Sequence, residues 1–379
     1  MNNAERTLLE LIKASLFSIP PHIPEDTDWT AVMNEAKSQA VLAIAAQSLP
    51  AEQYQLWARS VYRQIAGYIR TVHAEEDLID LLDHAGIPVI ILKGSAAALY
   101  YPVPSKRAMG DIDFIVPVEY FEQAAQLLKE NGYRVRIAPE DGTSREMSFL
   151  KNHIEYELHY RFSDDDIDIE RYITQEWGNI TTGSLEGHKF PMLPKLANGL
   201  VLLAHVGHHL KLGLGIRQII DWMMYCHAGL DDAFWESDFK KACEDTHLLT
   251  LAVTVTRMCQ KYLGLEESIT WCRNADESLC DELMEALLYS GNFGHKNRTG
   301  NLIEKTAVNF KREGLLRYLQ RAGEHNWDAY KKHPSLRPFC WAFQIFRYIR
   351  QGGKRGKKLF EDIERGKARY KMLAKLDLK

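Results

Sequence analysis

The chain of 379 residues is 46% hydrophobic and 26% charged, which is the balance of a globular protein with two or three subdomains. No apolar run approaches the ~20 residues of a membrane helix, and the acidic N-terminus lacks the pattern of a secretory signal. We therefore expect a cytoplasmic protein with no membrane partner. The net charge of −4 is unevenly spread, because residues 347–379 carry twelve basic and four acidic side chains.

Residues 1–86 predict a helical N-terminal region, because apolar side chains recur at helical spacing. Three segments show this period: 4–17, 27–49 and 54–86. Asp26 or Thr27 is expected to cap the second helix, and the sequence Gly-Ile-Pro from Gly86 is expected to end the third.

The hydrophobic period changes after residue 86. Short apolar runs between turn residues predict strands at 88–94, 111–116, 133–139, 146–151 and 153–162. A short helix is expected over 95–101, and an amphipathic helix over 117–132, with Pro near its start and Gly at its end. Residues 87–185 should therefore form an α+β domain, a mixed sheet with helices packed on it.

Helical period returns at 193–226 and dominates the rest of the chain, so residues 186–379 predict a helical C-terminal domain. The Gly/Asn-rich segment 290–301 is either a flexible surface loop or a cover over phosphates through Lys296 and Arg298. The six cysteines show neither close pairs nor zinc-type spacing, so we expect reduced thiols.

The basic tail, residues 347–379, carries a net charge of +8, which leaves −12 on the remaining residues. One interpretation is a solvated helix whose basic side chains pack on the acidic body. The other is a site for RNA phosphates. No RNA-recognition motif or aromatic stacking platform accompanies the tail.

Two aspartates interrupt the apolar strand "DIDFIV". Alternate side chains of a strand share a face, so Asp111 and Asp113 should point the same way while Ile112, Phe114 and Val116 fill the core. Neighbouring carboxylates repel each other and are costly to bury. A bound divalent cation removes that cost, and Mg²⁺ and Mn²⁺ favour carboxylate oxygens.

The strand "HIEYELHY" repeats this pattern, with His153, Glu155, Glu157 and His159 on one face. If it lies beside the aspartate strand, Glu155 or Glu157 joins the two aspartates. Three carboxylates can hold two metal ions, as in sites of phosphoryl transfer.

The pair Gly94-Ser95 lies where the strand predicted at 88–94 meets the short helix predicted at 95–101. Glycine lets a phosphate approach the backbone, and free N–H groups at a helix start attract anions. Lys93 and Arg107 flank the pair with positive charge, so Lys93, Gly94, Ser95 and Arg107 are candidate nucleotide-binding residues. Fifteen residues, 96–110, separate this turn from the aspartates and suggest a loop over the nucleotide.

These motifs together resemble a known family. A Gly-Ser turn, a short helix and an Asp-x-Asp strand are the signature of the nucleotidyltransferase superfamily, which has the polymerase β-like fold. More narrowly, three segments resemble the bacterial uncharacterised nucleotidyltransferase family, with a resemblance that spans residues 85–225. The segments are "LKGSAAALYYPVPSKRAMGDIDFIV", "YELHYRF" and "LLAHVGHHLKLGLGIRQIIDW".

This resemblance implies transfer of a nucleoside monophosphate from an NTP to an acceptor hydroxyl, with release of pyrophosphate and with Mg²⁺ or Mn²⁺ as cofactor. It implies that Asp111 and Asp113 bind metal, and that Glu157 is the third ligand and the base, because an acid two residues before His matches the family. It makes the Gly94-Ser95 turn the phosphate site. His159 is expected to orient Glu157 or to face the acceptor.

Two alternatives remain at the level of function. The acceptor is a small molecule such as an aminoglycoside or sugar, a protein side chain or an RNA end; the acidic body favours a cationic small molecule and the basic tail favours RNA. A catalytically idle nucleotide- or partner-binding module of the same fold is the other interpretation. The three intact acids argue against it.

The segment 193–226 carries further candidate cleft residues. His205, His208 and His209 share one helix face. That spacing can bind zinc, but the metalloprotease glutamate is missing and no further ligand is apparent. We therefore expect packing against the nucleotide domain, with His208 as a cleft candidate. Arg217 and Asp221 predict an intrahelical ion pair, with a role at the cleft as the alternative.

Overall fold

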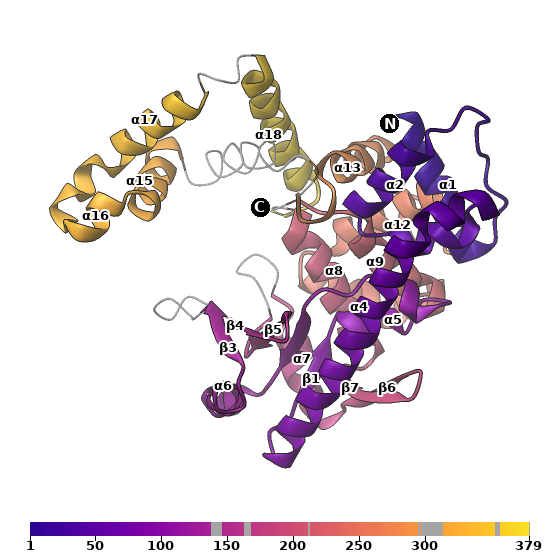
Figure 1. The fold of residues 1–379 in the computed structure, drawn as a ribbon, viewed down its shortest axis with the longest axis horizontal. Coiled ribbons are helices and arrows are strands. Elements are labelled where there is room, and N and C mark those ends of the chain that lie inside the picture. Colours follow the sequence, from indigo (N-terminus) through magenta and orange to yellow (C-terminus); the bar gives the residue numbers. More distant parts are fainter. Residues whose placement is uncertain are drawn as a thin grey trace.

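The computed structural model describes residues 1–137, 146–162, 168–210, 213–294, 296, 314–352 and 357–378. In Figure 1 a helical body lies at the upper right, a β-sheet lies below it, and α15–α17 project at the upper left. The sheet and its helices agree with the expected α+β class.

The helical body is built from both ends of the chain (Figure 1). Its N-terminal helices are α1 (Asn3–Phe17), α2 (Trp29–Ser38) and α3 (Leu42–Ala45). From the second half come α8 (Lys195–Leu210), α9 (Ile216–Gly229), α10 (Asp232–Phe234), α11 (Lys240–Asp245), α12 (Leu249–Leu263) and α13 (Glu277–Ser290). One apolar core joins the two sets, and it includes Leu8, Leu203, Ile219 and Leu283. The first three helices therefore share their core with the helices of the C-terminal half.

The sheet has seven strands in the order β3-β4-β5-β2-β1-β7-β6. The five expected strands are β1 (Ile90–Leu92), β2 (Ile112–Ile115), β3 (Arg134–Ile137), β4 (Glu146–Lys151) and β5 (Ile154–His159). The sequence analysis missed the hairpin of β6 (Thr181–Leu185) and β7 (His188–Met192), of which β7 pairs in parallel with β1. The domain boundary expected at residue 185 thus falls inside the sheet. The segment contains Pro191, which is uncommon within strands and favoured a connection.

The helices around the sheet are α5 (Gly94–Ala98), α6 (Phe121–Glu130) and α7 (Glu170–Thr174). On the face toward α4 and α6, Ile112, Phe114 and Val116 are buried as the alternation predicts. On the opposite face, Ile90 and Ile115 belong to the core of the helical body. The odd positions of β2, including Asp113, therefore lie between the sheet and the body.

A single long helix, α4 (Ala51–His84), passes from the body to the sheet (Figure 1). At 1.5 Å per residue it is about 51 Å long. Trp57 and Val61, in its first half, pack in the core of the body, whereas Tyr68, Leu78 and Leu82 pack in the core of the sheet. The helix thus belongs to both cores.

The N-cap of α2 is Asp28, so the expectation of Asp26 or Thr27 was wrong. The Asp28 carboxylate accepts hydrogen bonds from the backbone N–H groups of Thr30 and Ala31, each at 3.0 Å. Thr27 instead lies in a turn, where its hydroxyl donates to the Pro24 carbonyl. The carboxylate that reaches the free N–H groups is therefore the one directly before the helix.

The last helices are α15 (Leu315–Asn326), α16 (Asp328–Lys332), α17 (Cys340–Gly352) and α18 (Lys357–Lys375). The basic helix α18 returns to the body. The Arg369 guanidinium donates to the Leu210 carbonyl at 3.1 Å, and Lys375 pairs with Glu282 at 2.7 Å. These contacts favour the packing interpretation of the tail.

Lys296 also contacts the body. Lys296 Nζ lies 2.9 Å from a Glu5 oxygen and 2.7 Å from a Glu35 oxygen. The interpretation that Lys296 covers phosphates is therefore wrong, since its charge is paired in the helical body. Arg298 lies outside the described residues.

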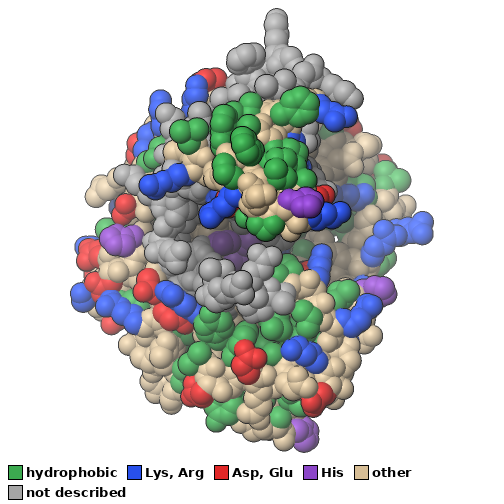
Figure 2. All heavy atoms as spheres, turned by 90° about the vertical axis from the view of Figure 1, so that its left-hand side faces the viewer, with side chains coloured by type: hydrophobic (Ala, Val, Ile, Leu, Met, Phe, Trp, Pro, Cys, Tyr) green, Lys and Arg blue, Asp and Glu red, His purple; other side chains and the backbone are tan. Residues whose placement is uncertain are grey.

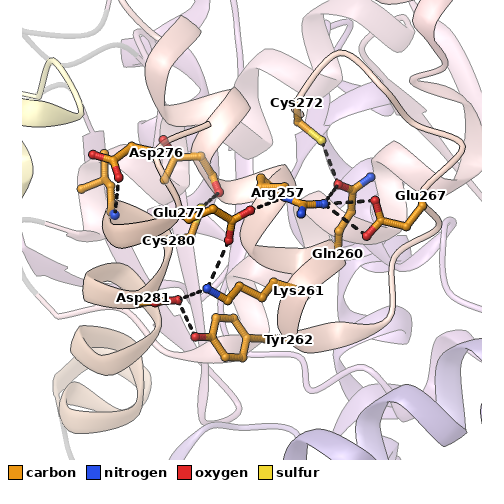
Figure 3. Close-up of polar contacts among 12 residues, drawn as sticks. Arg257, Gln260, Lys261, Tyr262, Glu267, Cys272, Asp276, Glu277, Cys280 and Asp281 are labelled. Atoms are coloured by element: carbon orange, nitrogen blue, oxygen red, sulfur yellow. Dashed lines mark hydrogen bonds and ion pairs between the residues drawn. The ribbon is translucent and has the colours of Figure 1, made fainter. Parts of the chain in front are cut away.

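Charged side chains connect α12 to α13 on the surface (Figure 3). Arg257 pairs with Glu277 at 2.7 Å and with Glu267 at 3.0 Å. Lys261 and the Tyr262 hydroxyl both contact Asp281. Each exposed pair contributes little, about 0–1 kcal/mol, so the network mainly fixes the register of the two helices.

All six cysteines are buried and free, which confirms the expectation that none is in a disulfide. Within the described residues, no helix is long and apolar enough to cross a membrane.

A close contact between two helices of the body lies at Gly199 of α8, and it generates a prediction. A Cβ at this position would lie 2.3 Å from the Tyr225 ring, which is buried and donates a hydrogen bond to the Lys195 carbonyl at 3.0 Å. Gly199→Ala should therefore destabilise the protein by about 1–3 kcal/mol through overpacking. The measurement is thermal or urea unfolding.

The matched control is Gly178→Ala, because a Cβ there has no neighbour within 4 Å. It should unfold close to wild type. Equal stability of the two variants would show that α8 and α9 do not pack as described.

Candidate active site

The two acidic strands lie side by side. β2 and β5 pair in parallel, with Asp113 opposite Glu157 and Ile115 opposite His159. Partners in this register point to the same face of the sheet. The condition set by the sequence, that the two strands are neighbours, is therefore met, and the acids from the two motifs meet between the sheet and the helical body.

Asp113 is the centre of this cluster, with 3% of its surface exposed. One of its oxygens, Oδ1, lies 2.6 Å from Lys93 Nζ and 3.3 Å from His159 Nε2. The same His159 nitrogen lies 3.8 Å from Glu157 Oε2, while His159 Nδ1 lies 3.4 Å from Glu146. Two cationic groups and one further acid thus surround Asp113.

Burial and neighbouring charges shift the pKa values of these groups in different directions. Burial raises the pKa of Asp113, but Lys93 and then His159 outweigh it and hold the pKa well below its usual range. Burial, followed by the charge of Asp113, raises the pKa of Glu157 to about 8. Burial lowers the pKa of His159, but its hydrogen bonds to Asp113 and Glu157 outweigh this and raise it to about 9. Without metal, an ionised Asp113 therefore lies between two cations.

Asp111 and Glu155 are at the margin of the cluster. Asp111 directly precedes β2 and is half-buried, and burial together with Asp113 raises its pKa. Glu155 forms an ion pair with Arg136 of the edge strand β3. Since Glu157 is opposite Asp113 and Glu155 is engaged elsewhere, the geometry favours Glu157 as the third carboxylate. His153, expected on the same face, lies outside β5 in a turn with φ 65°.

The Gly-Ser turn follows β1 as expected, but its serine hydroxyl is bonded within the protein. Ser95 is fully buried, and its Oγ donates to Glu75 of α4 at 3.0 Å. Glu75 also contacts His188 of β7 at 2.9 Å. Only the backbone of Ser95 is left for the expected phosphate contact.

Glu75 is a site-supporting residue that the sequence analysis missed. It is 1% exposed and lies on the buried stripe of α4 with Tyr68, Thr71, Leu78 and Leu82. A lone acid within an apolar helical stripe must find a partner when it is buried. That signal was present in the sequence and could have identified Glu75.

Arg107 does not flank the turn as a nucleotide ligand, and this expectation was wrong. Its guanidinium forms two hydrogen bonds with Asp221 of α9, at 2.7 and 2.8 Å, and 3% of Arg107 is exposed. The Tyr101 hydroxyl donates to the same carboxylate at 2.6 Å. Burial opposes ionisation of Asp221, but Arg107 outweighs it and lowers the pKa of Asp221.

Arg217, expected to pair with Asp221, still contributes its charge to the lowered pKa of Asp221, but the close contacts of this carboxylate are with Arg107 and Tyr101. Arg217 instead donates to the Ala108 carbonyl at 3.0 Å, and the Gln64 amide donates to the Lys106 carbonyl at 3.0 Å. The segment 96–110, expected as a loop over the nucleotide, is thus anchored to α9 and α4. It holds the residues just before Asp111.

The histidine face of α8 lies opposite the acids. The rings of His205 and His208 each contact the ring of His209, with centroids 4.3 and 5.1 Å apart. Burial and then the charge of Lys93 lower the pKa of His205, and they lower that of His209 to about 3. Figure 2 shows a hollow on the side of α15–α17, with histidine at its back. The lowered pKa values of His205 and His209 favour their neutral forms.

The cluster fits a divalent metal. Ligand atoms of Asp113, Glu157 and His159 lie within 4.8 Å of one another, and no other group of three such residues is this close in the described part of the chain. Carboxylate oxygens suit Mg²⁺ and Mn²⁺, and an imidazole is also compatible with Mn²⁺. Asp111, directly before β2, adds a second aspartate whose charge interacts with Asp113 and Lys93.

This arrangement is accompanied by a match of sequence. Residues 25–264, more than half of the chain, match the family described as uncharacterised nucleotidyltransferases. The chain belongs to this nucleotidyltransferase family. The matched range contains the sheet, the acids, the Gly-Ser turn and the α8–α9 segment. The resemblance noted in the motifs is therefore confirmed for the family and for its class of enzyme.

Solved structures that are similar over part of the chain include nucleotidyltransferases. The antibiotic-resistance factor ANT(2'')-Ia is 14% identical over 47% of this chain and 93% of its own, with a TM-score of 0.36. The lincomycin-bound lincosamide adenylyltransferase LnuA is 17% identical over 39% of this chain and 90% of its own, with a TM-score of 0.28. A nucleotidyltransferase-like protein from Paracoccidioides brasiliensis is 16% identical over 49% and 88%, with a TM-score of 0.29. No curated protein matches this nucleotidyltransferase.

The raised pKa values of Glu157 and His159 predict how the stability of the protein depends on pH. The folded state keeps the proton of Glu157 from pH 4.5 up to about 8, and that of His159 from 6.5 up to about 9, where the unfolded chain has lost them. More protons bound in the folded state mean that stability falls as pH rises. In chelator, the melting temperature should therefore fall between about pH 6 and pH 9.

Glu157→Gln should flatten this dependence, because glutamine has no proton to lose. Glu155→Gln is the control and should retain the wild-type slope. A wild-type melting temperature that rises across this range would contradict the described electrostatics.

Proposed function

We propose that this protein transfers a nucleoside monophosphate from an NTP, bound with Mg²⁺ or Mn²⁺, to an acceptor hydroxyl and releases pyrophosphate. One observation carries the proposal. Asp113 and Glu157 are paired in register on two parallel strands, and the Lys93-Gly94 turn ends the neighbouring strand. An acidic centre beside a phosphate-sized turn is what such a reaction requires.

The roles of the residues follow from this geometry. Asp111, Asp113 and Glu157 would hold the metal ions, with His159 as a further ligand or as a partner that orients Glu157. The metal, when bound, supplies charge that stabilises the phosphates during the transfer. The backbone of Gly94 and Ser95, with Lys93, would contact the phosphates of the NTP.

The bond changes involve few protein atoms. The acceptor oxygen forms a bond to the α-phosphorus of the NTP, and the bond from this phosphorus to the bridging oxygen breaks, so pyrophosphate leaves. The acceptor proton goes to Glu157. In the metal-free cluster Glu157 keeps its proton up to about pH 8, and the charge of a bound metal would favour the ionised carboxylate that acts as the base.

The intact acids argue against an idle binding module. Three carboxylates on one face are costly to maintain without a cation, and the pKa of Asp111 is raised by its surroundings. We place the reaction in the cytoplasm, because six buried free thiols suit a reducing compartment.

The acids test this function. Asp111→Asn and Asp113→Asn should each reduce nucleotide transfer by at least ~100-fold, because positioned metal charge supplies several kcal/mol to such reactions. Their stabilities should differ. Asp111→Asn relieves repulsion and should leave the metal-free protein as stable or slightly more so. Asp113→Asn removes the partner of two buried cations and should cost about 3 kcal/mol.

The measurements are calorimetry with Mn²⁺ and a non-hydrolysable NTP, and unfolding in chelator. Glu157→Gln should impair transfer but retain measurable NTP binding, since both aspartates remain. Glu155→Gln, on the same strand face, is the matched control and should behave as wild type. Metal-dependent NTP binding by both aspartate variants at wild-type strength would refute the function.

The acceptor class is identified by labelling. Wild type and Asp113→Asn are incubated with each α-³²P-labelled NTP and a cell extract, and the label is separated into small-molecule, protein and RNA fractions. Label that depends on Asp113 and survives protease and RNase indicates a small molecule. Label that is lost only on protease treatment indicates a protein acceptor, and label that is lost only on RNase treatment indicates an RNA acceptor.

A further inference from the structure

Lys93 is in direct contact with the centre of the acidic cluster. Its Nζ lies 2.6 Å from Asp113 Oδ1, and 10% of the Lys93 side chain and 3% of the Asp113 side chain are exposed. Burial lowers the pKa of Lys93, but the charges of Asp113, Asp111 and Glu157 outweigh this and raise it. Lys93 is therefore a cation that all three acids attract.

The backbone holds Lys93 there in an unfavourable conformation. Its φ of 53° and ψ of −123° lie in a region that favours glycine, and such a conformation costs a non-glycine residue of order 1–3 kcal/mol. The next residue, Gly94, also has a positive φ, of 22°. A lysine at a position that suits glycine indicates that its side chain has a use in this place.

The ammonium and a metal ion would need the same oxygen. A divalent ion bound by Asp113, Glu157 and His159 must reach ligand atoms that lie within 4.8 Å of one another. Lys93 Nζ and His159 Nε2 already contact the same Asp113 oxygen. A divalent ion added beside the ammonium would be strongly repelled by it in so small a space.

We propose that Lys93 is the resident cation of the metal site, which neutralises Asp113 in the metal-free protein and is displaced from it when a divalent ion binds. The inference rests on the metal-dependent function proposed above. The residue after Lys93 begins the Gly-Ser turn, so the displaced ammonium stays beside the turn and can pair with an anionic phosphate. Metal binding without nucleotide is then opposed by Lys93, and binding with nucleotide is not.

The experiment measures Mn²⁺ binding without nucleotide. Wild type and Lys93→Met are titrated with Mn²⁺ by calorimetry. Removal of a unit charge this close to the acids should tighten Mn²⁺ binding by about tenfold or more. In chelator, Lys93→Met should melt below wild type, because Asp113 has lost a partner, and saturating Mn²⁺ should restore most of the loss.

Lys189→Met is the matched control. Lys189 is an exposed residue of β7 in the same sheet, so the change removes the same charge away from the acids. It should bind Mn²⁺ as wild type does. Tightening of similar size in this control would indicate a net-charge effect and overturn the proposal.

The second variant is Lys93→Gly. Glycine adopts a φ of 53° without strain, so this variant should fold even if Lys93→Met does not. The same tightening is expected. Wild-type or weaker Mn²⁺ affinity in the folded variants means that Lys93 only supports the structure, which overturns this inference but not the proposed function. Absence of Mn²⁺ binding in every protein, with or without an NTP analogue, refutes both.

Discussion

The buried contact between Arg107 and Asp221 connects the two halves of this enzyme. Arg107 lies in the segment that leads into the acidic strand, and Asp221 lies on α9 in the helical body. Two hydrogen bonds from the guanidinium and one from Tyr101 satisfy the carboxylate. A buried pair of this kind is costly to break because the remaining charge has no partner. The position of Asp111 and Asp113 relative to α8 therefore depends on it.

Two buried ion pairs in the same region differ in what they allow. The Arg107 pair is fully satisfied, so it fixes a loop. The Lys93 pair joins a flexible side chain to a carboxylate that has another neighbour, His159, so its ammonium can leave while Asp113 keeps one partner. Arginine suits the first role because its planar fork matches a carboxylate, and lysine suits the second because it is a point charge on a flexible stem. The enzyme thus has a rigid support next to an exchangeable centre.

The sequence predicted those features that depend on local pattern. Five strands and the amphipathic α6 followed from alternation and helical period, whereas the pairing of the two acidic strands is known only from the structure. The β6–β7 hairpin was not predicted because "TTGSL" and "HKFPM" contain few of the residues typical of strands. The hairpin joins the sheet through the pairing of β7 with β1. Its identity depends on a contact across the sheet and not on its own composition.

The site shows the same limit. The alternation along each strand predicted the face of Asp113 and of the pair Glu155 and Glu157, and the choice of Glu157 came from the family resemblance. The partners of Arg107 and Ser95 were not predicted, because Asp221 and Glu75 lie far away in the sequence and only the packing of α9 and α4 brings them there. The roles of charged residues in a loop are set by the helices around it. Resemblance to a family gave the acids but not this support.

The double membership of α4 limits how the enzyme can be divided. A fragment that began at residue 87 would contain every proposed metal ligand, yet it would expose the sheet face that Tyr68, Leu78 and Leu82 cover. It would also leave Ser95 and His188 without Glu75. The catalytic sheet is therefore not an independent folding unit, because α4, which precedes it in the chain, covers one of its faces. Any gene fusion or truncation that is meant to keep the sheet folded must retain α4.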